Sequence, residues 1–432
     1  MTGSATTVGT QQAASLGELP TWDLSDLYPG PDSAELAADL DRMEAAARDF
    51  AQRYAGKLGS IDGATLGRAV AEYEAMDETL SRIMSFANLV YAADMSDPKI
   101  ASFFQGIQER VNAISTHLLF FSLELNRLED PQVEDAARAP ELARYRPWLR
   151  DLRVFRKHQL SDEVERLLHE KYVTGRAAWN RLFDETIAGL RFHVDGRDMT
   201  SAEALNCLSD HDGAKRREAA VEIGRVLGAN IRTFALITNT LAKDKEIEDK
   251  WRGYPQPWSS RNLGNHVEDE VVDALAAAVK TAYPDLSHRY YRLKAKWFGG
   301  DRLDYWDRNA PLPRDADTLI PWDQARDIVL DAYGRFSGEL ASVGRRFFDN
   351  AWIDAEVRPG KAPGAFAHPT VPSVHPYLLL NYQGRTRDVM TLAHELGHGV
   401  HQVLAGKQGH LLADTPLTLA ETASVFGEML TF

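Results

Sequence analysis

The apolar residues in the first third of the chain recur every three or four positions, which is the period of an amphipathic α-helix. The pattern predicts one helix that begins at a capping box formed by Asp32 and Glu35, and a second over residues 64–92. A third helix is predicted to begin at Pro98 and to run without a break to Leu125. Because the links are short, we expect antiparallel helices whose apolar stripes form a shared core.

A pattern of the same period continues through the middle of the chain and is interrupted by one short hairpin. Residues 190–199 are typical of such a hairpin, with an Asp-Gly dipeptide at the turn. We place a domain boundary there, with a disordered tail at 1–20, an N-terminal helical lobe at 21–195 and a second domain at 196–432. Further helices are expected at about 161–179, 201–249, 268–298 and 322–350, and an extended stretch at 303–312.

Proline changes the character of the chain after residue 351. Prolines recur from Pro359 to Pro376 and exclude a long helix. Residues 371–382 have strand character, and their prolines limit them to the edge of a sheet. An edge strand can pair its free backbone groups with an extended peptide, whereas a strand packed inside a small sheet cannot. The sequence leaves both alternatives open.

Composition and charge narrow the class of protein. Of its 432 residues, 44% are apolar and 26% are charged, as in ordinary soluble globular proteins. The net charge of −14 argues against nucleic acid or an anionic membrane as the main partner, since both are bound by basic surfaces. The single cysteine, Cys207, cannot form a disulfide within the chain, and neither a signal peptide nor a bilayer-spanning apolar run is recognisable. We therefore expect a cytoplasmic protein.

The candidate chemistry lies at residues 394–398, His-Glu-Leu-Gly-His, which follow the H-E-x-x-H pattern. On a helix, His394 and His398 lie one turn apart, so that both ring nitrogens can reach one zinc ion. Glu395 then stands beside the ion, where it can act as general base on a zinc-activated water. His401 shares this face, but it lies about 10.5 Å along the helix axis from His394. We expect His401 to support the site or to face the substrate, and a surface histidine with no role in the site is the alternative.

A catalytic zinc ion normally takes three protein ligands and leaves a place for water. A further helix is predicted from about residue 419, just after Pro416, and Glu421 on it lies 23 residues past His398. That separation lets the chain turn and come back alongside, so Glu421 is the expected third ligand of one zinc ion per chain. Glu428 or Asp414 is expected to orient a ligand histidine through its other ring nitrogen, and a solvated carboxylate is the alternative for both.

Four segments carry a further pattern: 22–28 (Trp-Asp-Leu-Ser-Asp-Leu-Tyr), 371–376 (Val-Pro-Ser-Val-His-Pro), Asn381-Tyr382 through the 394–398 helix, and Glu421-Thr422-Ala423-Ser424. Together they resemble the oligoendopeptidase F branch of the thimet-oligopeptidase-like zinc metallopeptidases. The resemblance implies a mainly α fold in which two helical lobes flank a deep channel, with a small β element just before the H-E-x-x-H helix. It implies cleavage of internal bonds in short unfolded peptides, with zinc on His394, His398 and Glu421 and with Glu395 as the general base.

The resemblance also implies later helices that carry a histidine and tyrosines for binding the substrate and stabilising the tetrahedral intermediate. We assign residues 196–432 to a catalytic zinc metallopeptidase domain. We expect the C-terminal part of that domain, which would carry these later helices, to be missing. The preferred hypothesis is a zinc-dependent endopeptidase that acts on oligopeptides. The alternatives are an inactive zinc-binding fragment, a non-catalytic peptide-binding helical protein, and a zinc exopeptidase of the carboxypeptidase type.

Overall fold

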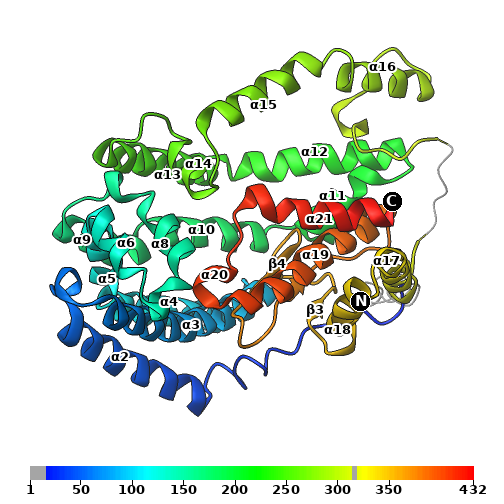
Figure 1. Cartoon of the computed structure of the whole chain (residues 1–432). Helices are drawn as coiled ribbons and strands as arrows, with labels where there is room; N and C mark the ends of the chain where they lie inside the picture. The colour runs from blue at the N-terminus through cyan, green and yellow to red at the C-terminus, as the bar shows by residue number, and fades with distance from the viewer. Residues whose placement is uncertain (1–15, 314–318) are drawn as a thin grey trace.

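The helices that the apolar stripes predict make up most of the protein (Figure 1). A computed structural model describes residues 16–313 and 319–432. Within these ranges, no helix combines the length and the apolar character that a bilayer-spanning segment needs. The helices of the N-terminal part are α2 (Ala34–Tyr54), α3 (Gly63–Ala93), α4 (Pro98–Thr116), α5 (Leu119–Arg127), α6 (Asp130–Ala136), α7 (Pro140–Ala143), α8 (Arg146–Arg153), α9 (Asp162–Lys171) and α10 (Arg176–Gly189).

Several predicted helix ends are wrong because local side-chain chemistry decides where a helix begins and stops. The cap of α2 is Ser33, whose hydroxyl accepts from the N–H of Leu36 at 3.4 Å, and not Asp32. The third predicted helix ends at Thr116, whose hydroxyl donates to the carbonyl of Asn112 at 2.9 Å, and α5 is separate. Other predicted helices are divided at Gly175 (α9 from α10), after Ala282 (α15, Asp269–Ala282, from α16, Ser287–Trp297) and at Ser337 (α17, Trp322–Phe336, from α18, Gly338–Asp349). The helix with the H-E-x-x-H pattern is α19 (Thr386–Ala405).

Three short strands form a sheet in the order β3-β5-β4, and they correct the prediction of an edge strand at 371–382. The paired part of that segment is β5 (Tyr377–Leu379), and it is the central strand. It pairs in parallel with β3 (Ile353–Asp354) and antiparallel with β4 (Phe366–His368). The prolines lie before the paired residues and leave the ladder intact. The strand order makes β4 an edge strand, and β4 lies next to the helix that carries the H-E-x-x-H pattern.

The predicted hairpin is present as β1 (Phe192–Val194) and β2 (Arg197–Met199), paired antiparallel. It packs with α11 and α12 into a small separate core that includes the buried Cys207. The stretch 303–312 is not fully extended, because Tyr305–Asp307 form a 3-10 turn. Figure 1 shows α15 and α16 above α12. These helices are α11 (Ser201–Asn206), α12 (Gly213–Ala229), α13 (Ile231–Arg252), α14 (Ser259–Gly264), α15 (Asp269–Ala282) and α16 (Ser287–Trp297).

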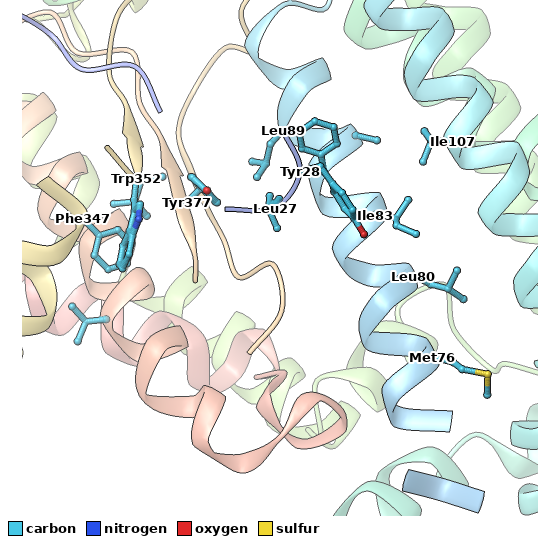
Figure 2. Packing of buried hydrophobic residues seen from close by; sticks show 14 of the residues in the cluster. Leu27, Tyr28, Met76, Leu80, Ile83, Leu89, Ile107, Phe347, Trp352 and Tyr377 are labelled. Carbon is cyan, nitrogen blue, oxygen red and sulfur yellow. The ribbon is translucent and has the colours of Figure 1, made fainter. Parts of the chain in front are cut away.

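The main apolar core runs through both predicted lobes, from α2–α5 to α17–α19. Leu27 and Tyr28 lie between α3 and the strand that carries Tyr377 (Figure 2). Tyr28 packs edge-on against Phe86 of α3 at 5.5 Å, and the hydroxyl of Tyr377 donates to the carbonyl of Asp23 at 2.8 Å. The segment at 22–28 therefore joins the first helices to the sheet below the candidate site, while the domain boundary near residue 195 stays a prediction.

The predicted disordered tail is wrong for residues 16–20. Leu16 is buried and packs at Gly384, in the loop before the H-E-x-x-H helix. The carbonyl of Pro20 accepts from the N–H of Ala355 at 2.9 Å. These contacts draw the segment into the same core despite its small and polar composition, and residues 1–15 lie outside the described ranges.

Candidate metal centre

The helix that carries H-E-x-x-H is α19 (Thr386–Ala405), and it has the two faces that its period predicts. Its start is fixed by Asp388, whose carboxylate accepts from the N–H groups of Gln383 at 3.0 Å and Arg385 at 2.9 Å. His394 and His398 remain partly exposed on the opposite side from the core. The buried apolar face consists of Val389, Leu392, Ala393, Leu396 and Val400.

Two glycines let α21 (Leu417–Thr431) cross α19 at close range (Figure 1). A Cβ atom added at Gly397 would lie 2.8 Å from the carbonyl oxygen of Ala423 on α21. A Cβ atom added at Gly427 would overlap the hydroxyl of Tyr333, from α17 (Trp322–Phe336), and would lie 3.0 Å from the carbonyl oxygen of Ala393. The backbones therefore approach closely because neither helix has a side chain at the crossing.

The crossing brings Glu421 to the two histidines. Its Oε2 lies 3.3 Å from Nε2 of His394 and 3.5 Å from Nε2 of His398, and the three donor atoms lie within 4.8 Å of one another. In a tetrahedral zinc site with bonds of about 2.1 Å, ligand atoms are separated by roughly 3.4 Å. The three residues therefore fit a zinc ion both in donor chemistry and in spacing.

The surroundings of the three donors favour the charge states that zinc binding requires. Burial lowers the pKa of His398, which keeps its imidazole neutral and able to coordinate. Ser424 donates to Oε2 of Glu421 at 3.0 Å and holds that carboxylate in place. Oε2 of Glu428 lies 3.3 Å from Nδ1 of His394, on the ring nitrogen that faces away from Glu421. This contact is the one expected of a carboxylate that orients a ligand histidine.

Glu395 occupies a different position from the three donors. Glu395 is buried, with 8% of its surface exposed. Burial raises the pKa of Glu395 to about 7, and the charge of Glu421 adds to this, while His394 and the backbone N–H of Ala367 lower it. A carboxylate with a pKa near neutrality can both take up and release a proton.

Two further expected residues, His401 and Asp414, are not among the three clustered donors and line a cavity of about 420 Å³ together with His398. His398 forms part of the same wall, and Thr370 and His410 lie across from α19. Within the described ranges, the side chain of Asp414 makes no hydrogen bond to His394 or His398. Of the two carboxylates expected to orient a ligand histidine, Glu428 is the one that lies at His394.

Several residues that build the site were not anticipated from the sequence. Tyr333 donates from its hydroxyl to the carbonyl of Ala393 at 2.6 Å and fixes α17 against α19. Gly397 and Gly427 permit the crossing with α21, and a glycine on each of two helices was the available signal. The backbone of Ala367 on β4 reaches Glu395, a contact that depends on which strand lies at the edge and has no local sequence signal.

Comparisons with known proteins find similarity to one group of peptidases. Residues 124–192 match the family model described as Oligopeptidase F, and residues 339–432 match the model of Peptidase family M3. The chain is 24% identical to Oligopeptidase PepF of Bacillus subtilis over 431 residues, which covers 95% of this chain and 62% of that protein. It is also 24% identical to Group B oligopeptidase PepB of Streptococcus agalactiae over 424 residues, or 94% of this chain and 68% of that protein.

Solved structures show the same fold. A putative oligoendopeptidase F from Bacillus anthracis superposes with a TM-score of 0.72 at 16% identity, covering 91% of this chain and 70% of the other. Oligoendopeptidase-F from Enterococcus faecium gives a TM-score of 0.63 at 19% identity, covering 92% and 66%. The resemblance to the oligoendopeptidase F branch and the mainly helical fold are thereby confirmed. The chain spans less than two thirds of the length of PepF.

Proposed function

We propose, from the resemblance to oligoendopeptidase F and the geometry at α19 and α21, that the protein is a zinc-dependent endopeptidase acting on short oligopeptides. The observation that carries the proposal is Glu421, which reaches His394 and His398 from a second helix at 3.3 and 3.5 Å. His394, His398 and Glu421 would hold one zinc ion. Zinc in such a site supplies Lewis-acid activation of water and of a peptide carbonyl.

Glu395 would act as the general base and then as the general acid. Its carboxylate takes the proton from the attacking water and delivers it to the nitrogen of the departing amine. Both transfers need a pKa near neutrality, which burial gives this carboxyl group. No covalent intermediate on a protein side chain is required, so the buried Cys207 has no part in the reaction.

A peptide would lie along the free edge of β4. The backbone of Phe366–His368 pairs with β5 on one side. On the other side an extended chain would have to replace the contact in which the carbonyl of Ala367 accepts from the side chain of Gln402 at 3.3 Å. The cavity beside His398 and His401 adjoins Thr370, two residues past this strand. This pairing would use hydrogen bonds to the peptide backbone, which do not depend on the peptide's side chains. It would therefore suit an enzyme that accepts oligopeptides of different sequences.

The test of this function is hydrolysis of a fluorogenic oligopeptide blocked at both ends. We expect cleavage at an internal bond, loss of cleavage in a zinc chelator, and recovery on adding back stoichiometric zinc. Chelator-insensitive cleavage would exclude the zinc mechanism, and cleavage confined to unblocked peptides would indicate an exopeptidase. Stoichiometric zinc binding without cleavage of any peptide would indicate a peptide-binding or zinc-binding protein that lacks catalysis.

Glu428→Gln is expected to weaken zinc binding about tenfold while leaving the fold intact. The amide cannot match the negative charge that Glu428 places 3.3 Å from Nδ1 of His394, so the imidazole becomes a poorer donor. Zinc affinity is measured by competition with a chromophoric chelator. Glu339→Gln, an exposed change of the same kind on α18 (Gly338–Asp349), is the control and should bind zinc like the wild type. Equal affinities in both variants would exclude an orienting role for Glu428.

A further inference from the structure

A second cavity adjoins the one beside the metal centre. It has a volume of about 500 Å³ and lies between α3, α4 and α10, with His368 and Thr370 from the sheet side. Ser81 and Thr370 line both cavities, so the two lie side by side along α3. The proposed chemistry at Glu395 uses no residue of this second cavity, which leaves its polar side chains without an assigned role.

Tyr91 in this wall carries a buried hydroxyl that has no hydrogen-bond partner within the described ranges. Its side chain is 3% exposed, and its ring stacks on Phe104 with centroids 4.6 Å apart and planes 5° from parallel. Leaving a buried hydroxyl unpaired costs free energy, so such groups are rare unless a ligand or water completes them. The stacking fixes the ring, which means that the hydroxyl cannot turn to another partner.

Asp184 supplies a negative charge to the same wall. The neighbouring cation, Arg181, lies 3.4 Å from Glu185, so that its charge is balanced there. Within the described ranges, the Asp184 carboxylate has no hydrogen bond and no ion pair. Burial and the charge of Glu185 raise its pKa to about 6, as expected of a carboxylate that lacks a counter-ion.

Apart from Asp184 and Arg181, the polar groups that line the cavity are neutral. Asn88, Gln108 and Asn180 contribute amides, and His368 is held uncharged because burial lowers its pKa to about 4. Burial raises the pKa of Tyr91, and the carboxylates of Glu185 and Asp184 raise it further while Arg181 lowers it, which places the hydroxyl within reach of both negative charges. The cavity therefore presents one unbalanced negative charge and several acceptors, a combination that suits a cationic donor.

We propose that this cavity binds a primary ammonium group of the peptide substrate, with Asp184 as its counter-ion and the Tyr91 hydroxyl as a second acceptor. The proposal rests on the peptidase function above. Ser81 and Tyr91 are ten residues apart on α3, which is a rise of about 15 Å. An extended peptide that runs along α3 from Ser81 to Tyr91 covers that distance in about five residues. The source of the ammonium is the peptide's N-terminus or a lysine side chain.

The test is the binding of blocked ten-residue peptides to zinc-loaded Glu395→Gln chain, measured by calorimetry so that cleavage does not interfere. Each peptide carries one lysine, moved position by position, and is compared with the same peptide carrying norleucine. A further pair differs in a free or an acetylated N-terminus. We expect one position, or the free N-terminus, to improve affinity about tenfold, and this result identifies the source of the ammonium.

Three variants in the same background decide the outcome. Asp184→Asn should abolish the preference for the ammonium, whereas Asp273→Asn, an exposed change of the same kind on α15, should keep it. Tyr91→Phe should reduce the preference without lowering the thermal midpoint, because its hydroxyl has no described partner to lose. Equal binding of lysine and norleucine peptides, no binding of any peptide, or a preference that survives Asp184→Asn would overturn the proposal. A further outcome is that Asp184→Asn abolishes the preference while the protein with Glu395 intact cleaves no peptide. That pair of results would support the ammonium site and count against the proposed hydrolysis.

Discussion

Glu395→Gln is expected to lower kcat/KM for a blocked oligopeptide by about 10³-fold while zinc affinity stays within about threefold of the wild type. Glutamine has the same shape and can still accept from the backbone N–H of Ala367, but it cannot take a proton from water. Since the side chain is 8% exposed, removing a buried charge should not reduce stability. Stopped-time assays with the fluorogenic peptide and chelator competition for zinc measure the two quantities.

The control for this result is Glu339→Gln. Glu339 lies exposed on α18, so this variant should retain full activity. An inactive Glu395→Gln protein that has also lost zinc would point to a structural defect and not to a missing base. Activity within tenfold of the wild type would show that another group moves the proton, and the proposed mechanism would then be wrong.

The face of α19 that carries the histidines could be predicted because a helical period determines it. Val389 and Leu396 fix which side is buried, so the positions of His394 and His398 follow. Glu421 could be anticipated from the need for a third donor, but its approach to 3.3 Å could not. That distance depends on a pair of glycines 30 positions apart, and nothing local in the sequence relates one to the other.

The edge of the sheet and the ends of the helices were the least predictable parts. Prolines near residue 376 indicated an edge strand, yet they stand outside the ladder, and β4 takes the edge with only three paired residues. Helix breaks such as that at Thr116 leave the apolar stripe in phase, because α4 and α5 pack on the same core. Leu16 is buried through a contact with Gly384, 368 positions along the chain, which composition alone cannot indicate.

Gly427→Ala is expected to lower the free energy of unfolding by about 2–3 kcal/mol and to weaken zinc binding at least about tenfold. The added methyl group would overlap the hydroxyl of Tyr333, which is buried and bonded to the carbonyl of Ala393 at 2.6 Å. Either that bond breaks or α21 moves outward and carries Glu421 away from His394. Denaturant unfolding and chelator competition follow the two effects separately.

Gly106→Ala provides the matched control, because a Cβ atom at that position on α4 meets nothing within 4 Å. It should raise stability by about 0.5–1 kcal/mol through helix propensity and leave zinc binding unchanged. Adding Tyr333→Phe to Gly427→Ala removes the nearest overlapping oxygen, so part of the zinc affinity should return even though a hydrogen bond is lost. If Gly427→Ala bound zinc like the wild type, close helix approach would not be what positions Glu421. The glycine at 427 would then matter for packing against Tyr333 alone.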